Sequence, residues 1–476
     1  MPIRNWGVGL LHSTNETTNH RGGKAVTLKS VFLEDTLNSL EEICKVETEM
    51  KRIAEIARKH GKVQTLVHHI NVENLKAKHK QALSKKATGV DGVTKEIYEE
   101  NLEQNLSNLI NRMKRQAYKP QSARRVYIPK EGSNDKRGLG IPAYEDKLVQ
   151  SIIADALTAI YETKFLDISY GFRPKRSCHD AIKAIGKIIE KNKVNYVVDA
   201  DIKGFFDNVD HEWMMKFLEH DIEDVNFLRI IKRFLKSGIM EEGQFIRTDA
   251  GTPQGGVISP ILANVYLHYA LDLWFEKVVR KECKGEAYMI RYADDFVCCF
   301  QYKDEAELFY LSLKERLGKF GLELAEDKSK IIEFGRFAEN NRKDKGEGKP
   351  ETFDFLGFTH YCSKSRNGWF RVKRKTSKKK QNIKLSNMKA WIRKRMHAPV
   401  DETIKTLNRK LIGHYNYYGI TDNSNSIQSF YYHTIRELFK VLRRRTQRNK
   451  LNWEKFSKIL MFNPIAPPGI RVNIYD

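Results

Sequence analysis

The chain has 476 residues, of which 41% are hydrophobic and 11% aromatic, so it can build a sizeable core and is not disordered throughout. Its formal net charge of +24 indicates a polyanionic partner, either nucleic acid or an anionic membrane surface. No apolar run approaches the roughly 18–20 residues of a membrane span, which argues against an integral membrane protein.

The N-terminal region is predicted to be an arm followed by a helical extension. Residues 1–23 are rich in Ser, Thr, Asn and Gly and do not make a signal peptide. Between residues 28 and 61, apolar residues recur at helical spacing among many charges. None of the six cysteines forms a Cys-x-x-Cys pair, so a zinc finger has no support, and a reducing, intracellular setting fits best.

The middle of the chain mixes helical and strand-like segments, which predicts an α+β fold. One hairpin is expected to have its tip at residues 130–137, between two short β-like runs. A second hairpin is expected within residues 288–300, where two apolar strands flank an acidic turn. The other predicted elements are helices over residues 94–117 and 147–161 and a buried strand over residues 195–201.

Most of the surplus positive charge lies toward the C-terminus. Residues 361–450 contain 24 Lys and Arg but only four acidic residues. Residues 371–380 are predicted to be a basic linker, and helical patterns with interleaved aromatic residues follow it, as at residues 414–418. A basic run alone is usually a solvated or nuclear-targeting face, but a whole basic block with aromatics favours a surface that lies along nucleic acid.

Three acidic residues are candidates for a metal site. Asp201 ends an otherwise apolar strand, where its charge needs a partner. Asp294 and Asp295 are adjacent at the tip of the second hairpin and repel each other unless a cation neutralises them. If this hairpin packs beside the earlier strand, the three carboxylates converge and suit two Mg²⁺ ions, which bind oxygen ligands and support phosphoryl transfer. Taken alone, an Asp-Asp pair is more often an ordinary acidic turn.

Several sequence blocks occur in an order that resembles reverse transcriptases, and in particular those encoded by group II introns. Tyr292-Ala293-Asp294-Asp295 together with Asp201 is similar to the catalytic set of these enzymes. The resemblance extends from about residue 65 to about residue 465. The other matching blocks are residues 128–130 with 137–142, 170–174 with 177–181, 201–211, 251–260, 321–324 with 328–330, 355–358 and 411–418.

The resemblance implies a right-hand polymerase, in which α+β fingers and palm with antiparallel sheet are followed by an all-α thumb or X domain. Many relatives carry a C-terminal zinc-type endonuclease, but no cysteine follows Cys362, so endonuclease activity is not expected. The implied domains are an N-terminal arm and helical extension at 1–61, fingers and palm at 62–360, a basic helical thumb or maturase domain at 361–455 and a C-terminal tail at 456–476.

The resemblance also implies roles for individual residues. Asp201, Asp294 and Asp295 would be catalytic and would hold two Mg²⁺ ions, with help from the carbonyl of Ile202. Phe206 would exclude a 2′-hydroxyl from the sugar pocket, because an aromatic ring leaves no room for the extra oxygen. The remaining implied contacts are Lys130, Arg137 and Gln254 for the incoming dNTP, and Arg173, Lys328, Arg374, Lys378, Arg443, Arg444 and Arg445 for nucleic acid.

Two of these assignments have alternatives. Phe205 is the second choice for the sugar-pocket residue, and both phenylalanines could instead be plain core residues. Gly138 stands where the family often has proline, and Lys130 and Arg137 are one residue further apart than in some relatives. Lys136 could therefore take the part of Arg137.

The implied function is RNA-directed DNA synthesis, in which a primer 3′-oxygen attacks the α-phosphate of a dNTP, together with intron RNA binding that promotes splicing and retrohoming. The expected partners are an RNA template such as group II intron RNA, a DNA primer or target, and dNTPs, with no membrane partner, in the cytoplasm of a bacterium. Two alternatives stay open: a maturase acting mainly as an RNA-binding splicing factor, and a domesticated stand-alone reverse transcriptase in phage defence, repair or CRISPR spacer acquisition. An RNA replicase is disfavoured by Phe206.

Overall fold

The computed structural model describes residues 44–129, 136–241, 243–246, 250–251, 255–445 and 451–475. The chain divides into two units, Met1–Glu49 and Met50–Asp476, and every element named below lies in the second. Residues 50–60 are helical, as predicted, whereas residues 28–43 of the same prediction lie outside the described residues. Within the described ranges, no helix combines the length and apolarity that crossing a membrane requires.

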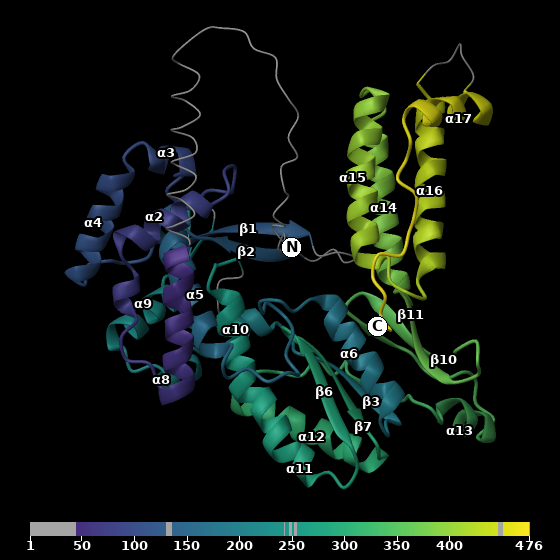
Figure 1. Cartoon of the computed structure of the whole chain (residues 1–476), viewed down its shortest axis with the longest axis horizontal. Coiled ribbons are helices and arrows are strands. Elements are labelled where there is room, and N and C mark those ends of the chain that lie inside the picture. The colour runs from purple at the N-terminus through teal and green to yellow at the C-terminus, as the bar shows by residue number, and fades with distance from the viewer. Residues whose placement is uncertain are drawn as a thin grey trace, which may run out of the picture. The chain divides into compact units, whose positions relative to one another are not determined.

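A four-stranded antiparallel sheet with the order β6-β7-β3-β8 lies at the centre of this unit (Figure 1). The predicted buried strand and second hairpin are both confirmed, as β3 and as β6 with β7. Alternate residues of these strands enter two different cores, since Val198 packs with α12 on one face and Val197 packs with α6 on the other. Burial on both faces explains the continuous apolar runs in the sequence. The bounds are β3 Tyr196–Asp201, β6 Ala287–Tyr292, β7 Asp295–Phe300, β8 Lys330–Glu333, α6 Cys178–Lys191 and α12 Lys303–Lys319.

A second sheet, with the order β2-β1-β4-β5, contains the first predicted hairpin. β1 and β2 pair antiparallel from Arg124 opposite Ile141 to Pro129 opposite Lys136, which confirms the hairpin, while residues 130–135 of its tip lie outside the described ones. β4 joins β1 in parallel. The bounds are β1 Ala123–Pro129, β2 Lys136–Ile141, β4 Ile239–Glu241 and β5 Gln244–Ile246.

The predicted helix over residues 94–117 is two helices, so that prediction is wrong in its extent. The first begins after Thr94, whose side chain accepts a hydrogen bond from the Ile97 N–H. Asn101 then leaves the helical conformation and a second helix starts, while Asn105 Nδ2 donates to the Tyr98 carbonyl across the break. The predicted helix at 147–161 is confirmed and begins three residues earlier. The helices here are η1 Val67–His69, α2 Val72–Gln81, α3 Lys95–Glu99, α4 Leu102–Lys114 and α5 Tyr144–Tyr161.

Residues 371–380 are not a linker, which corrects the prediction from charge. They form strand β11 and the first turn of α14, and β11 is the edge of a third sheet with the order β11-β10-β9. Val372, Arg374 and Thr376 are buried at every second position, which is strand periodicity hidden under a high density of charge. The bounds are β9 Phe353–Phe355, β10 Phe358–Lys364 and β11 Phe370–Thr376.

The C-terminal part is helical and has its own apolar core. Leu407 and Leu411 of α15 and Phe430 and Leu438 of α16 are almost fully buried in it. Helices α14 and α16 pack side by side (Figure 1). The bounds are α14 Lys378–Lys394, α15 Val400–Tyr418, α16 Ser424–Arg443 and α17 Trp453–Phe462. The remaining helices are α7 Phe205–Asn208, α8 His211–Asp221, α9 Val225–Leu235, α10 Ser259–Leu267, the π-helical η2 His268–Asp272 and η3 Phe275–Val279, α11 Arg280–Glu282 and α13 Ala338–Asp344.

Candidate active site

Asp201 and Asp295 face each other across two neighbouring strands. Asp201 is the last residue of β3, Asp295 is the first residue of β7, and the two are register partners in the antiparallel pair. Directly opposed residues in such a pair have Cβ atoms about 4.5–5.5 Å apart. Asp294 lies in the turn immediately before β7. The structure therefore brings together the three carboxylates that the sequence singled out.

A third segment of the chain fixes the backbone around Asp201. The Ala325 N–H donates to the Asp201 carbonyl at 2.8 Å, and the Asp201 N–H donates to Ser329 Oγ at 3.2 Å. Lys328 Nζ lies 3.2 Å from Asp201 Oδ2. Lys328, which the sequence assigned to nucleic-acid binding, thus supplies a counter-charge to one of the clustered acids. Ile202 follows in a bridge with Leu324, which holds this end of β3 to the same segment.

Asp294 and Asp295 have raised pKa values. Burial, followed by the negative charges of Asp199, Asp294 and Asp201, raises the pKa of Asp295 to about 8. Burial, and then the charge of Asp201, also raises the pKa of Asp294, while the positive charge of Arg137 opposes that rise. Carboxyl groups with pKa values raised in this way bind a cation readily, because a positive charge removes the cost of ionising them together.

Asp199 is a fourth carboxylate of the cluster, and it is missing from the residues predicted from sequence. It precedes Asp201 by two positions, and side chains at that spacing point to the same side of a strand. Burial raises the pKa of Asp199 to about 6, and the charge of Lys330, its register partner on β8, opposes the rise. The signal was present in the sequence as two aspartates spaced by one residue within an apolar strand.

The two phenylalanines that follow β3 have different environments. Phe205 is 2% exposed, and its ring packs edge-on against Tyr266 in the core. Phe206 is half-buried and meets the ring of Phe205 at a centroid distance of 5.3 Å. Phe206 is therefore partly exposed, whereas Phe205 belongs to the core.

Only part of the predicted dNTP-binding set can be located. Arg137 lies on β2, opposite Ile128 of β1, and its charge acts on Asp294. The β1–β2 hairpin and the carboxylate cluster are therefore close enough to interact electrostatically. Lys130 and Gln254 lie outside the described residues.

Two protein-family models match consecutive parts of the chain. Residues 128–360 match the model of the reverse transcriptase, or RNA-dependent DNA polymerase, domain. Residues 371–458 match the maturase-specific domain of group II introns. The first match contains all four acids of the cluster, and the second contains β11 and helices α14 to α16.

Individual proteins are also similar to the chain. Protein YkfC of Escherichia coli K12 is 34% identical over 315 residues, and the match covers 60% of this chain and 78% of that protein. The chain belongs to the group II intron reverse transcriptase/maturase family. The group II intron-encoded protein LtrA of Lactococcus lactis is 42% identical over 185 residues, which are 39% of this chain and 31% of LtrA, so the match spans less than a third of that relative. A telomerase structure from Candida albicans, with 13% identity, covers 73% of this chain and 64% of its own at a TM-score of 0.40.

Membership of this family confirms the fold class expected from sequence, a mixed α+β region followed by a helical maturase region. It also implies metal dependence. Within the described parts of the chain, no three His, Cys, Asp or Glu side chains are already gathered as a bound ion would hold them. The donor set nevertheless fits a hard cation, because Asp201, Asp294 and Asp295 offer only carboxylate oxygens and carry raised pKa values at two of the three positions. An ion at Asp201 would replace Lys328 as its counter-charge.

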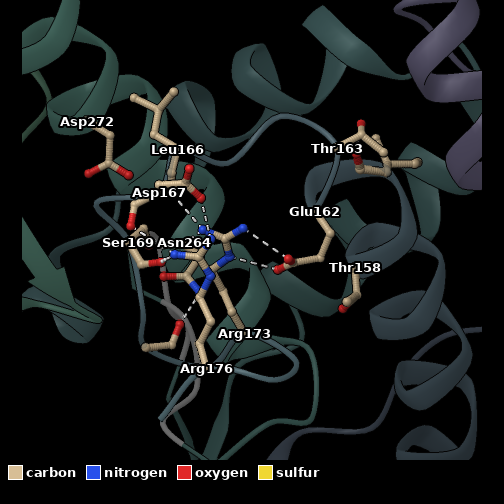
Figure 2. Close-up of polar contacts among 12 residues, drawn as sticks. Thr158, Glu162, Thr163, Leu166, Asp167, Ser169, Arg173, Arg176, Asn264 and Asp272 are labelled. Atoms are coloured by element: carbon tan, nitrogen blue, oxygen red, sulfur yellow. Dashed lines mark hydrogen bonds and ion pairs between the residues drawn. The ribbon is translucent and has the colours of Figure 1, made fainter. Parts of the chain in front are cut away.

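Arg173 corrects a predicted nucleic-acid contact. Its guanidinium makes a two-pronged ion pair with Glu162, with both N–O distances 3.0 Å, and it donates to the carbonyls of Leu166 and Ser169 (Figure 2). The residue is only 5% exposed. Because its donors are used inside the protein, Arg173 ties the chain after α5 to the following turn and does not offer its charge to a phosphate.

Arg374 is a second correction. It is 1% exposed, and its guanidinium lies so close to Gly186 of α6 that a Cβ there would be 1.6 Å from Nη2. Its other side is covered by the ring of Tyr475 at 5.6 Å. The alternation of β11 turns this arginine inward, while Lys373 and Lys375 point to the opposite side.

Of the remaining predicted nucleic-acid contacts, one is used inside the protein and three are exposed. Arg445 Nη2 donates to the carbonyls of Arg395 and Ala398, so it caps the end of α14 and is also corrected. Lys378, Arg443 and Arg444 are exposed on the helical region and are free to meet a polyanion. Their assignment as nucleic-acid contacts stays a prediction.

Proposed function

We propose that the protein is an RNA-directed DNA polymerase of the group II intron type that also binds its intron RNA. The observation that carries the proposal is the register pairing of Asp201 with Asp295, with Asp294 in the adjoining turn, inside the segment that matches reverse transcriptases. The reaction is attack of a primer 3′-oxygen on the α-phosphate of a dNTP, which forms a phosphodiester bond and releases pyrophosphate.

Each side chain of the cluster has a separate task in this proposal. Asp201, Asp294 and Asp295 would hold two Mg²⁺ ions, assisted by the carbonyl of Ile202. When bound, these ions supply charge neutralisation and activation of the attacking oxygen. Arg137, and Lys130 from the same hairpin, provide donors for the triphosphate oxygens. Gln254 would line the nucleotide pocket, and the ring of Phe206 would leave no room for a 2′-hydroxyl.

The helical region supports RNA binding as a second activity. It matches the maturase-specific domain, and its residues Lys378, Arg443 and Arg444 are exposed to solvent. Basic side chains on helices release counterions when they meet phosphates, so the affinity for RNA should fall steeply with salt. Promotion of intron splicing and retrohoming follows from this binding combined with DNA synthesis.

A single substitution separates the two activities. Asp294→Asn keeps the volume of the side chain but removes one of the charges that bind the cations. We expect primer extension on an RNA template with dNTPs to be abolished, while the affinity for intron RNA stays within several-fold and splicing persists.

The matched control is Asp344→Asn, an exposed acid at the end of α13, which should retain full primer extension. DNA synthesis that persisted in purified Asp294→Asn protein would contradict the active-site assignment. Loss of splicing in the same variant would show instead that the two activities share this site.

A further inference from the structure

The turn that carries Asp294 has a backbone conformation that needs support. Ala293, the residue before it, has a φ of 58°. This left-handed region is unfavourable for an L-residue other than glycine. Such a conformation persists only when the surrounding structure imposes it. The Ala293–Asp294 peptide is held by buried protein groups and not by solvent.

Arg291 provides the first part of that support. Its Nη1 donates to the Ala293 carbonyl at 2.9 Å. Its Nε and Nη2 hold the two carboxylate oxygens of Asp272 at 2.7 and 2.5 Å. Both side chains are fully buried. The fork geometry fixes the guanidinium in one orientation. The hydrogen bond from Nη1 therefore fixes the position of the Ala293 carbonyl.

Asn264 and Gly171 complete the arrangement. Asn264 Oδ1 accepts from Arg291 Nη1 at 3.0 Å, and its Nδ2 donates to the Gly171 carbonyl at 2.7 Å. A Cβ on Gly171 would lie 2.3 Å from the Ala293 nitrogen. Gly171 has no positive φ, so glycine is required here for space and not for backbone freedom. Gly171 therefore limits how far the turn can approach, and Asn264 fixes Gly171.

Asp272 is held by an unusual helical segment. It is the last residue of the π-helical turn η2, which directly follows α10, the helix that contains Asn264. π-helical turns are rare and frequently occur at functional sites. Figure 2 draws Asn264 and Asp272 together with the contacts of Arg173 and Arg176. One continuous helical element thus supplies two of the groups that hold Arg291.

We propose that Gly171, Asn264, Asp272 and Arg291 form a buried brace that positions the Ala293–Asp294 turn, and so sets where Asp294 and Asp295 lie relative to Asp201. The inference rests on the proposed polymerase function and names the positioning residues of that same site. None of the four would touch the metal or substrate. The brace acts on metal affinity through the geometry of the turn.

The test uses Gly171→Ala, with Gly318→Ala as the matched control, because Gly318 lies in α12 and has no atom within 4 Å of a Cβ position. Binding of Mn²⁺ alone to the full-length protein, followed by electron paramagnetic resonance, reports the site without any turnover. Substitutions that act behind metal ligands typically cost 10–100-fold in metal affinity. We expect a loss of about that size in Gly171→Ala, and an unchanged affinity in Gly318→Ala, with intron RNA binding intact in both.

A second variant keeps the proposal testable if Gly171→Ala does not fold. Arg291→Lys retains the buried charge but loses the fork, and we expect weaker Mn²⁺ binding with partial recovery of primer extension at high Mg²⁺. Wild-type Mn²⁺ affinity in a folded Gly171→Ala or Arg291→Lys protein would overturn the brace. Failure of the wild-type protein itself to bind Mn²⁺ would instead overturn the proposed polymerase function.

Discussion

At the scale of single residues, two neighbours with the same side chain have separate tasks. The sequence could not choose firmly between Phe205 and Phe206 for the sugar pocket, because both follow Asp201 closely and both are aromatic. Burial separates them in the structure: Phe205 belongs to the core, and Phe206 is partly exposed. Removal of each ring should therefore have a different consequence.

Phe206→Ala should relax the choice between dNTP and NTP. Without the ring, the sugar pocket has room for a 2′-hydroxyl, and discrimination that depends on such exclusion is worth on the order of 10–100-fold. The measurement is the ratio of kcat/KM for dNTP and for the matching NTP on one template. Phe205→Ala serves as the control: it should lower the free energy of unfolding by about 3–5 kcal/mol through the cavity it leaves. An unchanged ratio in Phe206→Ala would remove this residue from the pocket.

The three catalytic candidates stand out locally, as an acid at the end of an apolar strand or at a hairpin tip, but it is the order of the surrounding reverse-transcriptase-like blocks that made them predictable from sequence. The residues of the brace could not be predicted from the sequence. Asn264 and Asp272 lie in an apolar helical stretch where they look like ordinary polar substitutions, and Gly171 looks like a turn glycine. Their role depends on a buried arginine that brings them together beneath the turn, which only the tertiary structure establishes.

At the scale of elements, strand β11 shows how charge can hide a regular structure. Its basic residues suggested a linker, yet every second residue is buried against α6 and the helical core, and β10 pairs with it along its whole length. Lysine and arginine have long aliphatic stems, so a strand can carry them on one face without losing its packing on the other. The nucleic-acid contacts of this segment are therefore expected at the outward positions.

The double variant Lys373→Gln/Lys375→Gln should weaken RNA binding without unfolding the protein. For every phosphate of a single strand that the variant no longer neutralises, the slope of log affinity against log salt should become shallower by about 0.7. The measurement is a set of RNA-binding curves at increasing salt concentration. Arg374→Gln is the control, since it should lower the midpoint of thermal unfolding and leave the salt slope unchanged. The reverse pattern would mean that the assigned faces of β11 are exchanged.

At the scale of the whole molecule, two buried histidines, His268 in η2 and His414 in α15, stay neutral near pH 7. Burial, and then the charge of Lys384, lowers the pKa of His414 to about 4 in the core of α15 and α16, where its ring stacks on Phe430 at 3.9 Å. Burial also lowers the pKa of His268 to about 4; the negative charges of Asp272 and Asp221 oppose this shift, whereas the positive charges of Arg291 and Lys277 add to it. The unfolded chain takes up these protons near pH 6.5, whereas the folded protein does so only near pH 4.

The two histidines should therefore lower the stability of the protein as the pH falls from about 6.5 to about 4, against the opposite effect of the raised pKa values of Asp199 and Asp295. At each histidine the unfolded state binds more protons than the folded state in this range, which is worth up to about 3 kcal/mol. Chemical denaturation at a series of pH values measures the effect. His414→Phe should make the free energy of unfolding less dependent on pH between 6.5 and 4. This reduction is separate from any change in the free energy of unfolding at pH 7.5. A pH dependence of stability in His414→Phe equal to that of the wild-type protein would contradict the neutral state of the His414 ring.

The position of β3 in its sheet also bears on how the protein is made. β3 is the first strand of the sheet to leave the ribosome, yet it lies between β7 and β8, which are both synthesised later. Until those strands emerge, β3 has two unpaired edges, which makes the growing chain prone to wrong association. Its two aspartates meanwhile have no opposing acid with which to bind a cation. A nascent chain is consequently unable to copy RNA until most of the polymerase domain has been translated.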